Sequence, residues 1–422
     1  MGVISQLLQD VPAPRMARIW QSFAAPEVED VPRALKEQLA KPCILDTIKS
    51  GMRIAVGVGS RGLAELSTLV RVTVEEIRGR GGQPFIVPAM GSHGGATAEG
   101  QRGVLADLGV TEETAGCAIV ASMDVVEIGR LNNGLPVYID SHAYAADGIV
   151  IIGRVKPHTA FRGPSESGLV KMIAIGLGKQ RGAESCHAYS FKYMAEHIQA
   201  MSAIALERAP ILFGIATVEN AYEKIARVVA TPATELKATD RELLVEAKAN
   251  MPRFFFDSFD VLIVDRIGKE ISGDGMDPNI TGRYATQYAS GGPEIGKVVV
   301  LDLTQNTHGN AVGIGNADFI TRRMFNRIDF ERTYANSLTS TVTSCTRLPM
   351  ILENDRQAIL AAIKTCNARD LSKARVVRIK DTLHMGEIMV SESMLAEARE
   401  HPAIEILSEQ EEMRFDGEGR LL

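Results

Sequence analysis

The sequence predicts an α/β protein with two α/β domains, mostly parallel sheets, and an active-site cleft between the domains. Strand-length apolar runs alternate with segments of helical spacing, which is typical of parallel sheets with helical crossovers. The run DGIVIIGRV at 147–155 is apolar almost throughout, as in strands buried on both faces. A second strand-helix series starts with DVLIVD at 260–265, and 422 residues suffice for two or three domains.

Regular alternation begins after the first forty residues, in which we expect one short strand and one helix. Thr97 is a suitable N-cap for a helix that Gly109 ends, and Gly81 with Gly82 closes the preceding helix. The predicted strands are 52–59, 83–89, 147–155, 209–218, 260–265, 296–303 and 374–380, and the predicted helices are 61–82, 97–110, 191–206 and 240–249.

The aromatic-rich stretch MPRFFFDSFD at 251–260 marks an expected domain boundary near Pro252. We expect an N-terminal α/β domain over 1–252, which carries the functional loops, and a C-terminal α/β domain over 253–390, which closes the cleft. The last segment, 391–422, has helical composition and is expected to return to the first domain.

Composition excludes several classes of protein. The formal net charge is -6 with no basic stripe, which argues against nucleic-acid binding. No apolar run approaches the roughly 20 residues of a membrane span, and the N-terminus MGVISQLLQD lacks the features of a secretory signal. The five cysteines are widely spaced without a CxxC motif, which fits reduced thiols in a cytoplasmic protein. The composition is compatible with a homo-oligomer but does not require one.

Three predicted strands are each followed by a loop with a cationic or titratable residue. Arg61 follows the first, His93 the second and His158 the third. In open parallel sheets, ligands bind at the carboxyl ends of the strands, so these residues are candidates for one site. His93 lies among glycines, which let the backbone approach a ligand closely, but an exposed histidine in a tight turn explains the same pattern.

The loop after the third of these strands is long and polar, a feature often functional in compact domains. Next to His158 it holds Lys156, Arg162 and Ser165, which can engage a carboxylate or a phosphate. The alternative is a surface loop with an incidental histidine.

A lysine and a histidine stand out in the glycine-punctuated stretch that follows. Lys171 lies within an apolar run, where a lysine becomes a nucleophile or covalent anchor, unless its ammonium reaches the surface. Gly168 precedes it in this weak phosphate-loop-like pattern. Cys186 and His187 can ligate nickel, copper or zinc, although such a pair is more often structural.

The second domain offers weaker candidates. The stretch GKEISGDGMDPNITGR, which spans 268–283, is interpreted either as turns or as a wall of the cleft with Lys269 facing a substrate. A second glycine-rich segment, around His308, is either a hinge or a cleft lining.

The segments GSHGGAT (91–97), KPHTAF (156–161) and SGLVKMIAIGLGKQRGAESCH (167–187) together resemble the active-site segments of the LarA-type lactate racemases. The resemblance implies a nickel-pincer nucleotide held covalently by Lys171, with His187 completing the nickel coordination. It further implies an acid/base pair of His93 and His158, and Arg61 near the substrate.

The implied activity is racemisation or epimerisation of a small 2-hydroxy acid by reversible hydride transfer, with nickel-pincer nucleotide biosynthesis proteins as partners. Two bases on separate loops suit a reaction that removes and returns hydrogen on opposite faces. The stretch after the first strand lacks the acidic residue and proline usual in the family, and the loop before Lys171 is longer, so a substrate other than lactate is expected. A nickel-free Schiff-base lyase or epimerase using Lys171, a non-catalytic cofactor-binding protein and a one-way redox role are the alternatives.

Overall fold

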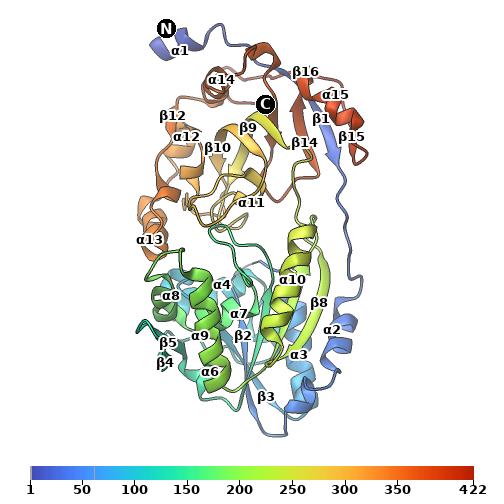
Figure 1. The fold of residues 1–422 in the computed structure, drawn as a ribbon, viewed down its shortest axis with the longest axis vertical. Helices are drawn as coiled ribbons and strands as arrows, with labels where there is room; N and C mark the ends of the chain where they lie inside the picture. Colours follow the sequence, from blue (N-terminus) through green and yellow to red (C-terminus); the bar gives the residue numbers. More distant parts are fainter. Residues whose placement is uncertain (1, 61) are drawn as a thin grey trace. The chain divides into compact units, whose positions relative to one another are not determined.

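The computed structural model describes residues 2–60 and 62–422. The chain forms two compact units. We call Ala25–Met251 the central unit, and Met1–Ala24 with Pro252–Leu422 the terminal unit. Each unit contains a sheet with parallel strands together with helices, which confirms the predicted α/β class (Figure 1). No described helix has both the length and the apolar character needed to cross a membrane.

The central unit is built on a five-stranded sheet of order β3-β2-β6-β7-β8. The first four strands are parallel and β8 is antiparallel to β7, while β4 and β5 form a separate hairpin. The strands are β2 (Arg53–Val58), β3 (Gln83–Pro88), β4 (Val125–Arg130), β5 (Pro136–Asp140), β6 (Gly148–Arg154), β7 (Ile211–Glu219) and β8 (Ile225–Pro232).

Helices connect these strands largely as the sequence predicts. Thr97 caps α4 by accepting a hydrogen bond from the backbone N–H of Gly100, and Gly109 follows the helix in a left-handed conformation. The helix predicted over 61–82 begins later, at Leu66. The helices are α2 (Val31–Leu39), α3 (Leu66–Gly79), α4 (Ala98–Asp107), α5 (Glu112–Ala115), α6 (Ser141–Tyr144), α7 (Leu169–Lys171), α8 (Lys179–His187), α9 (Met194–Arg208) and α10 (Leu236–Asn250).

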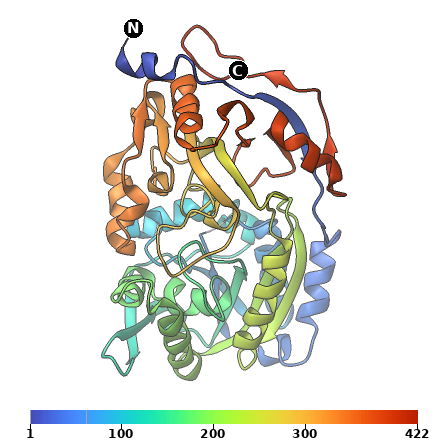
Figure 2. The same cartoon turned by 45° about the horizontal axis from the view of Figure 1, so that its top comes forward.

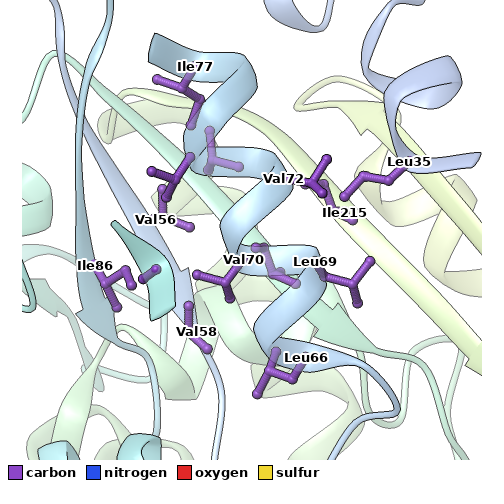
Figure 3. Packing of buried hydrophobic residues seen from close by; sticks show 14 of the residues in the cluster. Leu35, Val56, Val58, Leu66, Leu69, Val70, Val72, Ile77, Ile86 and Ile215 are labelled. Carbon is purple, nitrogen blue, oxygen red and sulfur yellow. The ribbon is translucent and has the colours of Figure 1, made fainter. Parts of the chain in front are cut away.

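One face of the central sheet packs against α3. Leu69, Val70 and Ile77 of this helix are fully buried, and they lie over Val56 and neighbouring sheet residues (Figure 3). The helix is amphipathic, so the apolar stripe alone accounts for its orientation on the sheet. Burial of each such side chain contributes roughly 1.5–3 kcal/mol.

The opposite face of the same sheet is lined with glycines. Because side chains alternate along a strand, Gly57 points away from α3. A Cβ at Gly214 would lie 2.6 Å from a methyl group of Leu169, and a Cβ at Gly153 would collide with Met172. The missing side chains let α7 and the π-helical turn Met172–Gly176 lie directly on the strands. The sequence thus places the segment around Lys171 close to the sheet.

The terminal unit has a sheet of order β12-β11-β10-β9-β13-β14-β1-β15, with β16 also paired to β1. The strands from β12 to β13 are parallel and the remaining pairs are antiparallel. The strands are β1 (Arg15–Gln21), β9 (Ser258–Ile267), β10 (Glu294–Leu303), β11 (Phe319–Thr321), β12 (Met350–Leu352), β13 (Val376–Ile379), β14 (Glu387–Ser391), β15 (Ile404–Ile406) and β16 (Glu411–Glu412).

Short helices complete the terminal unit, and Figure 2 shows the short helix α1, near the N-terminus, beside α14. α14 packs on β9, β10 and β11 and carries a run of buried residues. The helices are α1 (Val3–Leu8), α11 (Pro278–Thr281), α12 (Arg322–Phe325), α13 (Phe330–Ser340), α14 (Asp355–Thr365) and α15 (Leu395–Glu400).

The predicted domain limits 1–252, 253–390 and 391–422 need correction at both ends of the chain. The boundary at Pro252 agrees with the two units, but β1 pairs with β14, aligning Met16 with Ser391. The last segment adds β15 and β16 to the same sheet and stays in the terminal unit. The residue pattern of a strand does not specify which distant strand it pairs with. The sequence therefore did not predict that the first and last segments of the chain share one sheet.

Candidate active site

Three parallel strands of the central unit lead into the loops that carry predicted site residues. Because β2, β3 and β6 are parallel neighbours, their carboxyl ends lie at one edge of the sheet. β3 is followed by the loop with His93, and β6 by the loop with His158. Arg61, which follows β2, lies outside the described residues, so its contact with a substrate stays a prediction.

Three glycines shape the loop that carries His93. Gly91, Gly94 and Gly95 have φ angles of 60°, 67° and 64°, a left-handed conformation that favours glycine. The Oγ of Ser60 is hydrogen-bonded to Nδ1 of His93, so the loop after β2 orients the ring. The histidine is half-buried.

The ring of His158 is held by a backbone hydrogen bond and by aromatic packing. Its Nδ1 accepts from the backbone N–H of Ala160 at 3.1 Å, and therefore the neutral ring carries its proton on Nε2. The ring centroid lies 4.5 Å from that of Phe161 and 5.8 Å from that of Phe191. His158 is thus oriented as a proton donor through Nε2.

A fully buried carboxylate, Glu166, organises the loop after β6. It accepts hydrogen bonds from the backbone N–H of His158 at 2.9 Å and from Nζ of Lys248 at 2.7 Å. Arg162 contacts the same carboxylate at 3.3 Å and donates to the carbonyl of His158 at 2.7 Å. A buried carboxylate is costly unless it is paired, and these cations pair it. Arg162 therefore stabilises the loop, and its contact with a substrate stays a prediction.

Asp240 of α10 fixes the start of α7, which ends at Lys171. One carboxylate oxygen accepts from the backbone N–H of Leu169 at 3.0 Å and the other from that of Val170 at 2.9 Å. Gly168 has φ 154°, and a Cβ there would lie 2.6 Å from Oδ1 of Asp240. Glycine is therefore required for this capping, while contact of Gly168 with a cofactor stays a prediction.

His187 ends α8, which follows α7 through the π-helical turn. Its Nδ1 lies 2.6 Å from the carbonyl oxygen of Ala183. A carbonyl oxygen only accepts, so Nδ1 donates and Nε2 keeps its lone pair. Burial lowers the pKa of His187, the bond to Ala183 opposes this, and the charge of Lys171 lowers the pKa further. A neutral imidazole oriented by a backbone carbonyl is the form that binds metals.

Cys186 differs from its neighbour. It is fully buried, with its Sγ 3.4 Å from Sδ of Met194. Burial raises the pKa of Cys186 to about 12, with the charge of Lys171 acting in the opposite direction. Cys186 is thus a buried thiol packed against Met194, in contrast to His187, whose Nε2 keeps its lone pair. Within 2–60 and 62–422, no group of three or more His, Cys, Asp or Glu side chains is placed to hold a metal ion.

In the terminal unit, the predicted residues following β9 make local contacts. Lys269 donates from Nζ to the carbonyl of Gly273 at 2.7 Å. Asp277 caps α11, and Arg283 pairs with Asp318 at 3.2 Å. These contacts account for the shape of the loop, and the binding of a substrate by Lys269 stays a prediction.

The most buried cation near the predicted site was not identified from the sequence. Lys179 is fully buried, and its Nζ lies 3.2 Å from Oδ2 of Asp140, which is also fully buried. Lys179 lies near glycines but is followed by the polar residues Gln180 and Arg181, so it lacks the apolar run that identified Lys171. No local signal exists for Glu166 or Asp240, whose roles depend on contacts with distant segments.

A histidine–carboxylate pair in the terminal unit was also missed. Nδ1 of His384 lies 2.8 Å from Oδ1 of Asp381, whose carboxylate is buried. The pair follows β13, but a single histidine in the sequence gives no sign of such a partner. His308, in contrast, is exposed.

Part of the chain matches a known protein family. Residues 6–199 match the family model described as the lactate racemase N-terminal domain, a range that contains His93, His158, Lys171 and His187. This part of the chain is a lactate racemase N-terminal domain. The fold is also similar to the lactate racemase apoprotein from Thermoanaerobacterium thermosaccharolyticum, with a TM-score of 0.53 and 14% sequence identity. That match covers 86% of this chain and 94% of the other, and at this identity it concerns the fold alone.

A comparison with curated proteins found no match. The lactate racemase N-terminal domain over 6–199 supports a racemase-type role. The cofactor, the reaction and the substrate need further argument.

Proposed function

We propose that this protein racemises or epimerises a small 2-hydroxy acid with a nickel-pincer nucleotide attached through Lys171. The observation that carries the proposal is the arrangement of Lys171 and His187. Lys171 ends α7 and His187 ends α8, with the π-helical turn Met172–Gly176 between them. The charge of Lys171 lowers the pKa of His187. One chain thus offers an amine for attachment and an imidazole for nickel.

The chemistry of the two side chains fits that group. His187 keeps the lone pair of Nε2 because Nδ1 donates to Ala183, and its lowered pKa favours the neutral ring. Lys171 is half-buried at the end of a helix whose start is fixed by Asp240. The bound nucleotide would supply a carbon that accepts and returns the hydrogen of the substrate as hydride. Nickel ligands other than His187 would come from the nucleotide.

His93 and His158 would move the hydroxyl proton of the substrate. An imidazole titrates near pH 6.5, so it can take or give a proton at neutral pH. His158 carries its proton on Nε2 in the neutral form, and Ser60 orients His93 through Nδ1. Two such groups on separate loops suit a reaction that must act from both faces of a planar keto acid.

The carboxylate of the substrate needs a cation. We propose Arg61 for this role, with Arg162 and Lys269 as further candidates, because guanidinium and ammonium groups are the usual partners of carboxylates. Because the chain departs from the usual family sequence after β2, we propose a 2-hydroxy acid other than lactate. Cytoplasmic location and reliance on cofactor biosynthesis proteins belong to the same proposal.

Two alternatives predict different results. A Schiff-base enzyme would use Lys171 without nickel and would not need His187. A non-catalytic cofactor-binding protein would need Lys171 and His187, but not His93 and His158.

The test begins with the chain co-expressed with a complete nickel-pincer nucleotide biosynthesis pathway. We expect nickel in the purified protein and a mass adduct on the peptide that contains Lys171. Lys171→Ala should lose the adduct, His187→Ala should lose most of the nickel, and Lys237→Ala on α10 serves as a lysine control. Unmodified, nickel-free protein, in a preparation where a known lactate racemase is loaded, would exclude the proposed cofactor.

Activity is then measured on a panel of 2-hydroxy acids by chiral chromatography. His93→Ala and His158→Ala should each reduce isomerisation by about 100-fold or more, because positioned acid/base groups contribute 10²–10⁴-fold. Loaded protein that isomerises no 2-hydroxy acid would favour the binding-protein alternative. Full activity in both histidine variants would contradict the two-base scheme.

A further inference from the structure

Lys179 has an unusual environment for a lysine. Its side chain has 0% exposure, and its Nζ lies 3.2 Å from Oδ2 of Asp140, which also has 0% exposure. Nζ also donates to the carbonyl of Pro88 at 2.5 Å and to Oε1 of Gln101 at 3.1 Å. Burial lowers the pKa of Lys179, and Asp140 opposes this effect. Removing a lysine charge from water costs free energy, even when three polar partners surround it. Such a lysine therefore indicates a specific role.

The third partner, Gln101, connects Lys179 to the loop that carries His93. Gln101 is fully buried on α4, and its Oε1 is occupied by Lys179. Its amide nitrogen donates to the carbonyl of Gly91 at 2.9 Å and to the carbonyl of His93 at 3.3 Å. The ammonium of Lys179 only donates hydrogen bonds, so the atom of Gln101 that faces it is the oxygen Oε1. The N–H groups of Gln101 then point toward the His93 loop.

The two segments that this network joins are packed backbone to backbone. The backbone N–H of Gly91 donates to the carbonyl of Gly176 at 3.1 Å. A Cβ at Gly176 would lie 2.6 Å from the carbonyl oxygen of Ala89, so a side chain there would separate the segments. The contact joins the His93 loop to the helical run that carries Lys171.

The backbone of Lys179 adds a second sign of constraint. Its φ is 55°, a left-handed conformation that is unfavourable for a residue with a side chain. Such conformations persist where the surroundings over-determine them, and they cluster at functional sites. Lys179 lies midway between Lys171 and His187 along the chain.

We propose that Lys179 is a positioning residue that, through Gln101, fixes the His93 loop relative to the helical run of Lys171 and His187. The proposal rests on the proposed function, since it assigns His93 to proton transfer and Lys171 to cofactor attachment. A lysine that merely fills the core would stabilise the fold as a whole, whereas a positioning residue acts on one loop. Its loss would leave substrate binding largely intact and lower the rate of the chemical step.

Two variants separate these roles. Gln101→Met removes the two N–H donors while Lys179 keeps Asp140 and Pro88. The double variant Lys179→Met with Asp140→Asn removes the ion pair without leaving an unpaired buried charge, which would otherwise prevent folding. Lys237→Met is the control, because Lys237 also donates to a backbone carbonyl, that of Gln199, at 2.9 Å, although it is only partly buried.

Hydrogen exchange of the unloaded protein is measured first, by mass spectrometry. We expect amide exchange over 89–97 to be about 10-fold faster in both variants, which corresponds to a loss of about 1.4 kcal/mol of local stability. Exchange over the sheet strands should match the wild type, and Lys237→Met should leave 89–97 unchanged. Wild-type exchange over 89–97, or an equal increase throughout the central unit, would overturn the proposal.

The loaded enzyme gives the second readout. We expect kcat to fall by about 10- to 100-fold in both variants with KM within about threefold, because small misplacement of a reacting group costs on this order. An equal effect in Lys237→Met, or a loss confined to KM, would overturn the positioning role. If the wild type isomerises no 2-hydroxy acid, the proposed function fails, while the exchange data still decide whether Lys179 fixes the loop.

Discussion

The carboxylate of Asp240 accepts a hydrogen bond from the backbone N–H of Leu169, with 3.0 Å between oxygen and nitrogen. The bond joins α10 to the start of α7, 71 positions earlier in the sequence. Burial raises the pKa of Asp240 to about 7, although the bonds from Val170 and Leu169 act in the opposite direction. The segment that ends at Lys171 is thus held by a carboxyl group that titrates near neutral pH.

The first prediction concerns stability and pH. Because the pKa of Asp240 is higher in the folded protein than its usual 3.8, the folded state binds the proton more tightly. Its contribution is present in full below about pH 4 and is lost as the pH rises to about 7. The difference corresponds to at most about 4 kcal/mol. Asp240→Asn cannot titrate, so its free energy of unfolding minus that of the wild type should rise with pH over this window.

Urea unfolding at pH 4.5, 6 and 8 measures that difference. Asp107→Asn, at an exposed carboxyl on α4, is the control and should give a difference independent of pH. If the free energies of unfolding of Asp240→Asn and the wild type change with pH in parallel, the pKa of Asp240 is not raised in the folded protein.

The second prediction concerns Glu166. Glu166→Gln removes the charge that Arg162 and Lys248 pair with, and it weakens the bond to the backbone N–H of His158. We expect a loss of about 2–3 kcal/mol of stability, less than for a fully buried pair because both cations are partly exposed. Lys248→Met keeps the bond to His158 and should cost less than 1 kcal/mol.

Urea unfolding and the isomerisation rate of the loaded enzyme check both variants. Glu166→Gln should lower kcat through the His158 loop, whereas Lys248→Met should leave it nearly unchanged. Equal effects on kcat would mean that the Glu166–His158 bond does not control the placement of the histidine.

The strands β2, β3, β6 and β7 of the central unit were accessible from the sequence because their signals are local, whereas β4, β5 and β8 were not predicted. The run 147–155 forms β6, and Thr97 caps α4. The loops of His93 and His158 follow from the parallel order of the sheet, since its strands share one edge. These inferences use only residue patterns and the rule for ligand position.

The parts that the sequence did not predict depend on distant partners. The pairing of Met16 with Ser391 joins the two ends of the chain, and neither strand pattern specifies the other. The role of Glu166 requires Lys248 of α10, which is 82 residues later. Lys179 is followed by polar residues in the sequence, and only the fold shows that its ammonium is fully buried and paired.

The third prediction compares two glycines on α4. A Cβ at Gly100 would collide with the carbonyl of Gly94 in the His93 loop, whereas a Cβ at Gly103 meets nothing within 4 Å. Gly100→Ala should destabilise the protein by about 2 kcal/mol, because the added methyl group forces the loop away from the helix. Gly103→Ala should stabilise it by about 0.5–1 kcal/mol, because alanine has less backbone freedom to lose.

Thermal and urea unfolding measure both changes, and amide exchange over 89–97 locates the first. Exchange in this segment should increase in Gly100→Ala and stay at the wild-type rate in Gly103→Ala. Similar stability and exchange in the two variants would mean that Gly100 and Gly94 are not in contact in solution.

The fourth prediction concerns thiol reactivity. The thiolate is the reactive form of cysteine, and burial holds Cys186 as a thiol with a pKa of about 12. Cys43 is exposed, so iodoacetamide at pH 8 should label Cys43 within minutes and leave Cys186 unmodified in the folded protein. Peptide mass spectrometry at timed intervals measures the two rates, and labelling in 6 M guanidinium chloride is the control in which both should react. Rapid labelling of Cys186 in the native protein would mean that α8 opens readily, and the bond from His187 to Ala183 on the same helix would then not hold the ring in place.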